Sequence, residues 1–136
     1  MKAISCLLAI LALSLSVAVG QAETPQSSSP SALSSDYDDC LDATGGVTSN
    51  ILDCTHAEYD RQDDRLNSNY KDAMARLSSA RQASLRGAER LWIADRERRC
   101  RRELDEEGGG TWGDVLYATC FMETAAERAS WMERYR

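Results

Sequence analysis

The sequence predicts an all-α fold: a small disulfide-stapled domain with one short helix followed by three longer antiparallel helices. Apolar residues recur every three or four positions over long stretches, and no stretch alternates with a period of two. Glycine runs at 45–46 and 108–110 interrupt the helical pattern. Four cysteines, Cys40, Cys54, Cys100 and Cys120, follow the N-terminal apolar segment and flank these glycine runs in pairs.

The N-terminal segment, residues 1–22, has the composition of a secretory signal peptide. Lys2 precedes an apolar stretch over about residues 7–19, and small residues suited to a signal peptidase follow, up to Ala22. Cleavage after Ala22 would leave 114 residues and would change the net charge from −6 to −7. Cys6 precedes the apolar stretch, where a lipoprotein cysteine would not lie. We expect an exported protein, periplasmic or secreted, with no membrane anchor in its mature form.

A serine- and proline-rich leader, residues 23–35, is expected to be disordered because it has almost no apolar content. The helical domain is then predicted over residues 36–136. Asp36 can cap the first helix, Thr48 or Ser49 the second, and Ser78 or Ser79 the third. The predicted helices run from 36 to the glycines at 45–46, then over about 50–77, 81–105 and 113–136.

An even number of cysteines in an exported chain indicates two disulfides. Four cysteines allow three pairings, and the sequential one is favoured because each pair flanks a glycine turn between two helices. We therefore expect Cys40–Cys54 and Cys100–Cys120. Closing loops of this size contributes about 3 kcal/mol each in the chain-entropy model.

A basic cluster surrounds Cys100 and is the first candidate for an anion or nucleic-acid site. Acidic residues interrupt it and follow it at once, and helical spacing is expected to distribute its arginines around the axis. The net negative charge also argues against nucleic-acid binding, which needs excess cation. We interpret the cluster as a solvated charged helix. Its members are Arg96, Arg98, Arg99, Arg101 and Arg102.

Arg96 differs from its neighbours because Trp92, Arg96 and Cys100 are spaced four residues apart on the stripe that should face inward. A buried guanidinium without acceptors costs free energy. We therefore expect Arg96 to be a packing and hydrogen-bonding hub whose acceptors come from the second helix. The candidates are Glu58, Asp63 and Asn67.

Catalysis and metal binding have little support in the sequence. The chain has one histidine, His56, and no nucleophile motif surrounds it. Oxidised cysteines are not nucleophiles, and gaps of 13 and 19 residues between the paired cysteines are not those of zinc knuckles. No pair of carboxylates stands out for glycoside hydrolysis. We expect no enzyme activity, no cofactor and no metal.

Charge divides the domain into an acidic half and a basic half. Residues 36–64 contain nine acids and one arginine, whereas residues 76–102 contain nine arginines and three acids. We prefer the interpretation that the two oppositely charged halves attract each other as antiparallel helices. The alternative is an acidic surface that docks on a basic protein. The possible partner-binding residues are Asp36, Asp38, Asp39 and Asp42.

Several short motifs, taken together and in their order along the chain, resemble the small exported domain at the N-terminal end of LprI-type lysozyme inhibitors. The resemblance covers about residues 37–135. Its structural motif residues are Cys40 and Cys54, then Asp63, Leu66, Asn67 and Tyr70, then Trp92, Arg96 and Cys100, and finally Cys120, Thr124 and Arg128. The chain departs from that type in lacking a lipobox cysteine and in having Asp95 where an aromatic residue is usual.

The resemblance implies a disulfide-stapled helical domain and inhibition of lysozyme. The expected function is an exported binding protein that inhibits lysozyme-type peptidoglycan hydrolases by protein–protein contact, with a cationic lysozyme-like protein as the possible partner. The alternative is a structural or interaction module of the cell envelope that has another partner and does not inhibit. The sequence leaves the oligomeric state open.

Overall fold

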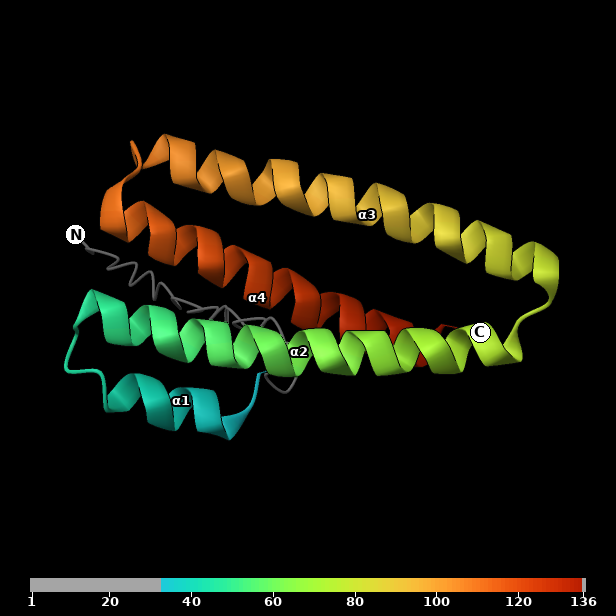
Figure 1. Cartoon of the computed structure of the whole chain (residues 1–136), viewed down its shortest axis with the longest axis horizontal. Helices are drawn as coiled ribbons and strands as arrows, with labels where there is room; N and C mark the ends of the chain where they lie inside the picture. Colours follow the sequence, from blue (N-terminus) through green and yellow to red (C-terminus); the bar gives the residue numbers. More distant parts are fainter. Residues whose placement is uncertain (1–32, 136) are drawn as a thin grey trace, which may run out of the picture.

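The structure, a computed structural model, describes residues 33–135. The predicted signal peptide and residues 23–32 of the predicted leader lie outside this range. The described residues form four helices and no strand, which confirms the all-α fold. Figure 1 shows α4 between α2 and α3, with α1 along the outer side of α2. The helices are α1 (Ser35–Asp42), α2 (Thr48–Arg76), α3 (Ser79–Glu106) and α4 (Gly110–Arg134).

The first helix begins one residue earlier than predicted, and its N-cap is Ser34 rather than Asp36. The Ser34 hydroxyl accepts a hydrogen bond from the backbone N–H of Tyr37, which satisfies one of the free donors of the first turn. The predicted hydroxyl cap of α2 is wrong, because Val47 occupies that N-cap position. Ser78 occupies the N-cap position of α3, as predicted, but its side chain makes no capping hydrogen bond.

The glycine corner between α3 and α4 is tighter than the sequence suggested, because α4 begins at Gly110 instead of about residue 113. Gly108, Gly109 and Gly110 all have positive φ angles of 73° to 76°, which residues with a side chain rarely adopt. Gly113 allows a close approach, since a Cβ there would lie 2.9 Å from the Leu104 side chain.

The core lies around α4, which contacts both long neighbouring helices. Small residues line the buried face of α4, and they let α2 approach closely (Figure 1). One core cluster joins the C-terminal halves of α2 and α4 to the N-terminal half of α3. A second joins α1 to α2 and α4. The buried members are Leu66, Ala73, Leu85, Ala129 and Met132 in the first cluster, and Tyr37, Cys54 and Met122 in the second.

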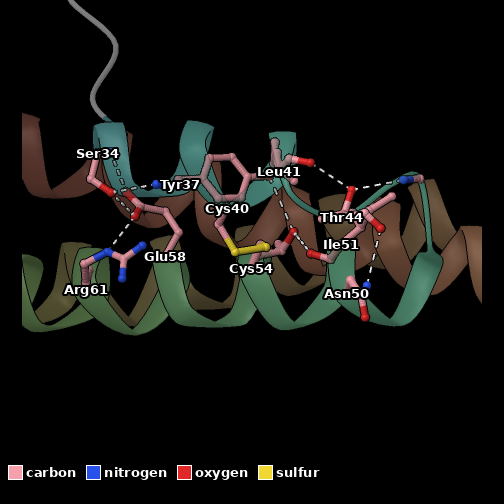
Figure 2. Close-up of a disulfide and its surroundings, with 12 residues drawn as sticks. Ser34, Tyr37, Cys40, Leu41, Thr44, Asn50, Ile51, Cys54, Glu58 and Arg61 are labelled. Carbon is pink, nitrogen blue, oxygen red and sulfur yellow. Dashed lines mark hydrogen bonds and ion pairs between the residues drawn. A yellow bond between two sulfur atoms is a disulfide. The ribbon is translucent and has the colours of Figure 1, made fainter.

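Both predicted disulfides are confirmed. Cys40–Cys54 joins α1 to α2, with 5.8 Å between the Cα atoms (Figure 2). Cys100–Cys120 joins α3 to α4, with 5.5 Å between the Cα atoms. The second disulfide is especially important for holding α3 against α4, because Leu85 and Cys100 are the only fully buried residues among those of α3.

Removing either disulfide should destabilise the domain by about 3 kcal/mol, since each closes a loop of similar length. We expect the double variants C40S/C54S and C100S/C120S to unfold at lower urea concentration than the oxidised wild type. Equilibrium urea unfolding with and without dithiothreitol measures this. Unfolding midpoints that do not respond to dithiothreitol in the wild type would contradict it.

Candidate functional site

The α1 acidic surface consists of Asp36, Asp38, Asp39 and Asp42, and all four residues are exposed. Tyr37 from the same helix points the other way and is buried against α2 and α4. The Cys40–Cys54 disulfide (Figure 2) and the Tyr37 side chain therefore anchor α1, and its four aspartates remain exposed. The structure brings these four predicted residues together on one short, covalently anchored helix.

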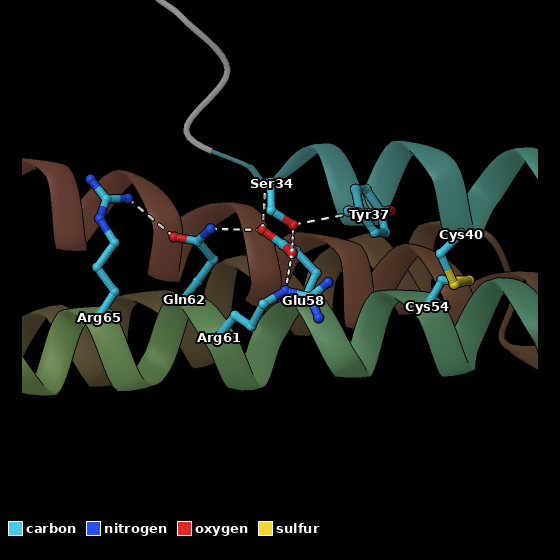
Figure 3. Close-up of polar contacts among 8 residues, drawn as sticks. All are labelled: Ser34, Tyr37, Cys40, Cys54, Glu58, Arg61, Gln62 and Arg65. Atoms are coloured by element: carbon cyan, nitrogen blue, oxygen red, sulfur yellow. Dashed lines mark hydrogen bonds and ion pairs between the residues drawn. A yellow bond between two sulfur atoms is a disulfide. The ribbon is translucent and has the colours of Figure 1, made fainter.

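A buried carboxylate, Glu58, fixes the start of α1 (Figure 3). The backbone N–H and the hydroxyl of Ser34 donate to its two oxygens at 2.9 and 2.6 Å. Gln62 and Arg61, one turn further along α2, donate to the same oxygens at 2.7 and 2.8 Å. Burial by itself raises the pKa of Glu58, but the hydrogen bonds from Ser34, Gln62 and Arg61 outweigh it and leave the pKa below its ordinary value.

The variant Glu58→Gln should lose about 2–3 kcal/mol of unfolding free energy at neutral pH, because its amide meets donors where the carboxylate accepted them. A depressed folded-state pKa stabilises above the ordinary pKa and loses that effect as the pH falls through the lower, folded value. The difference between wild type and variant should therefore stay constant from pH 7 down to about pH 4.5 and shrink at lower pH. Thermal unfolding followed by circular dichroism across this range measures it, and a constant difference would contradict the assignment.

Arg96 does not find the acceptors that the sequence analysis proposed. Its guanidinium lies between two rings, 4.6 Å from the centre of Trp92 and 4.7 Å from that of Phe121. Glu58 instead binds the start of α1, and Asp63 accepts from Asn67 in its own helix at 2.8 Å. Nε and Nη1 of Arg96 are buried without a hydrogen-bond partner. Cation–π attraction, not hydrogen bonding, holds this side chain.

Arg128 continues the same arrangement from α4. Its guanidinium lies 3.8 Å from the centre of the Trp131 ring and 5.5 Å from that of Trp92. Unlike Arg96, it also donates to a carboxylate, Glu89 of α3. We call this set, comprising Phe121, Arg96, Trp92, Arg128 and Trp131, the arginine–aromatic stack. It joins α3 to α4 and accounts for three residues of the resemblance, Trp92, Arg96 and Arg128.

The two stacked arginines should respond differently to replacement by methionine. Arg128→Met leaves the Glu89 carboxylate largely buried without its partner and should cost about 3 kcal/mol. Arg96→Met removes a cation that has no carboxylate partner and keeps a flexible apolar side chain against the rings, so its cost should be below about 1 kcal/mol. Urea unfolding measures both, and E89Q/R128M should recover part of the loss. A larger cost for Arg96→Met than for Arg128→Met would contradict the analysis.

A groove of about 390 Å³ lies between α2 and α3, which contact α4 rather than each other along most of their length. We call it the α2–α3 groove. It brings together predicted motif residues that are about thirty positions apart in the sequence. Its lining residues are Asp63, Leu66, Asn67, Tyr70, Arg86, Glu89, Arg90, Trp92, Ile93 and Arg96.

The arginines around Cys100 are less scattered than predicted. Arg96, Arg98, Arg99 and Arg102 line a single hollow of about 310 Å³ beside Thr124 of α4, and this hollow shares Trp92 and Arg96 with the α2–α3 groove. Arg96, Arg99 and Arg102 are spaced three apart and Arg98 and Arg102 four apart, so these side chains lie on neighbouring parts of one helix face. Arg101 lies elsewhere, 5.4 Å from the centre of the Tyr117 ring. Glu123, near Arg99, has its pKa raised by burial and by the neighbouring Glu127 and Glu103.

A third hollow, of about 570 Å³, lies between α2 and α4 and contains His56. Its walls are mainly apolar and aromatic, with Tyr59 and Phe121 packed edge to face. Tyr117, on the same wall, donates its hydroxyl to Glu97 at 3.2 Å, and burial followed by the Glu97 charge raises its pKa. No group of three metal-ligating side chains occurs within residues 33–135.

Sequence reasoning missed two residues on which these sites depend. Ser34 was assigned to the disordered leader, although a serine shortly before a buried tyrosine is a possible helix cap. Phe121 is the only phenylalanine of the chain, and its position next to Cys120 did not indicate that it would stack on Arg96.

Comparison with known proteins gives one match. The family model described as Lysozyme inhibitor LprI matches residues 40–132. No curated protein and no solved structure matches the chain. None of the helices in the described part is both long and apolar enough to span a membrane. The two disulfides and the family match are those of an extracytoplasmic protein.

Proposed function

The chain belongs to the lysozyme inhibitor LprI family, and from this premise we propose that it binds and inhibits a lysozyme-type peptidoglycan hydrolase by protein–protein contact. The family match is the observation that carries the proposal. In this function the chain contributes a rigid surface and performs no chemistry of its own. We place it in the periplasm or among secreted proteins, where such a hydrolase is encountered.

The α1 acidic surface is the docking surface that we propose for a cationic hydrolase. None of its four carboxylates forms an ion pair within residues 33–135. The ion pairs between helices instead join α4 to α2 through Arg65–Glu133 and α4 to α3 through Arg128–Glu89. None of these ion pairs joins the acidic half, residues 36–64, to the basic half, residues 76–102, so the mutual attraction preferred from the sequence is not realised as ion pairs. The carboxylates of α1 therefore remain unpaired among the described residues. Unpaired carboxylates on one face can steer a cationic partner toward it.

The mature, oxidised protein should slow the lysis of a cell-wall suspension by lysozyme. Asp39→Lys with Asp42→Lys should weaken this inhibition, because the pair reverses charge on the α1 acidic surface near the end of the helix, where cations are tolerated. Glu106→Lys with Glu107→Lys makes the same charge change at the end of α3 and should leave inhibition unchanged. Turbidity loss at several salt concentrations measures all three proteins, and salt should weaken the wild-type effect.

Unchanged turbidity loss at excess wild-type protein would remove the inhibitor function. Equal weakening by both double variants would keep the function but would exclude the α1 acidic surface as its specific contact, since net charge alone would then explain the effect.

A further inference from the structure

The α2–α3 groove contains polar side chains that the fold does not use. Asn67 is exposed, and its side-chain amide donates to Asp63, four residues before it in the same helix. Arg86 and Arg90 on the opposite wall are exposed and form no ion pair among the described residues. These groups do not hold α2 to α3, so the packing of the domain gives no reason for their convergence.

The charge of the groove is also unbalanced. Three guanidinium groups of α3, those of Arg86, Arg90 and Arg96, line it. The acids on its walls are Asp63 and Glu89, and Glu89 is already bound to Arg128. Nε and Nη1 of Arg96, packed between the two rings, are buried and have no acceptor, a rare condition for buried donors. The α3 wall therefore has more hydrogen-bond donors than the groove has free acceptors, which favours the binding of an anion.

We propose that the α2–α3 groove binds a small molecule that carries a carboxylate on a body with hydroxyl or amide groups. The guanidinium of Arg96, held between two rings, lines the groove and offers a fixed positive charge to a carboxylate. Asp63 and Asn67 on the α2 wall retain lone pairs and an N–H for the rest of the ligand. The volume of about 390 Å³ lies within the usual range for small-molecule sites.

The choice of ligand rests on the proposed function, because a protein that meets peptidoglycan hydrolases also meets peptidoglycan fragments. Two parts of such fragments share the required chemistry: the lactyl carboxylate of N-acetylmuramic acid and the terminal carboxylate of a stem peptide. N-acetylglucosamine has the same sugar ring as the first but no carboxylate, and it therefore serves as a matched neutral control.

The experiment is an NMR titration of the mature, oxidised, ¹⁵N-labelled protein with N-acetylmuramic acid, D-alanyl-D-alanine and N-acetylglucosamine in turn. At least one carboxylate probe should shift the signals of the Trp92 indole N–H and the Asn67 side-chain amide. N-acetylglucosamine should not shift them. The carboxylate probe that binds more tightly identifies the sugar or the peptide end as the source.

Three variants test the location. Arg96→Met should lower the affinity by about tenfold or more, because it removes the central charged donor. Arg90→Gln should lower it about two- to fivefold, as expected for an exposed charged contact. Arg99→Gln is the matched control: Arg99 is an exposed arginine of the same helix that lines the hollow beside Thr124 and not the α2–α3 groove. It should leave the affinity unchanged.

Binding of N-acetylglucosamine equal to that of the carboxylate probes, or no shift with any probe, would overturn the proposal. Equal losses in Arg90→Gln and Arg99→Gln would also overturn it, since the effect would then come from the general charge of α3. These outcomes do not bear on inhibition in the lysis assay, and a lack of inhibition in that assay does not bear on ligand binding in the titration. The two proposals can therefore fail separately.

Discussion

The attachment of α3 to α4 is the constraint on which the rest of the domain depends. This helix of 28 residues has only Leu85 and Cys100 fully buried, and Leu91 is 70% exposed. An ordinary apolar stripe is therefore not what holds it. The arginine–aromatic stack fills the interface instead, with the Cys100–Cys120 disulfide at one end and the Leu85 cluster near the other. Rings with a negative face accept the guanidinium groups in a space too dry for water to solvate them.

The same arrangement leaves room for the groove. The helix α4 lies between α2 and α3 (Figure 1), and each of them contacts α4. Small residues line the buried face of α4, whereas the rings and guanidinium groups of the stack fill its interface with α3. Arg96 takes part in both features, because its plane packs in the stack while the same residue lines the α2–α3 groove. Arg96 thus serves both the stability of the domain and the proposed ligand binding. Unfolding and ligand affinity must both be measured for its variants to separate the two effects.

The sequence was sufficient for the features that depend on local chemistry. Periodicity predicted the helices, and the positions of Cys40, Cys54, Cys100 and Cys120 beside glycine turns predicted both disulfides. It was insufficient where a residue's partner lies on another helix. Arg96 was correctly placed on the inward stripe, but nothing along the chain indicated that Phe121, rather than an acid of α2, would face it. The crossing of α3 over α4 decides this, and helix rotation is not encoded in spacing alone.

The two proposed surfaces differ in what holds them. The α1 acidic surface is presented by a short helix that has few apolar contacts of its own, so its orientation relies on the disulfide and on Glu58 beneath it (Figure 3). The α2–α3 groove is bounded by two long helices fixed through α4. A docking surface gains affinity from being held in its bound orientation before the encounter, because less conformational entropy is lost on binding. The buried hydrogen bonds of Glu58 therefore connect folding to recognition: they order Ser34 and the first turn of α1, and with it the carboxylates that a cationic partner would meet.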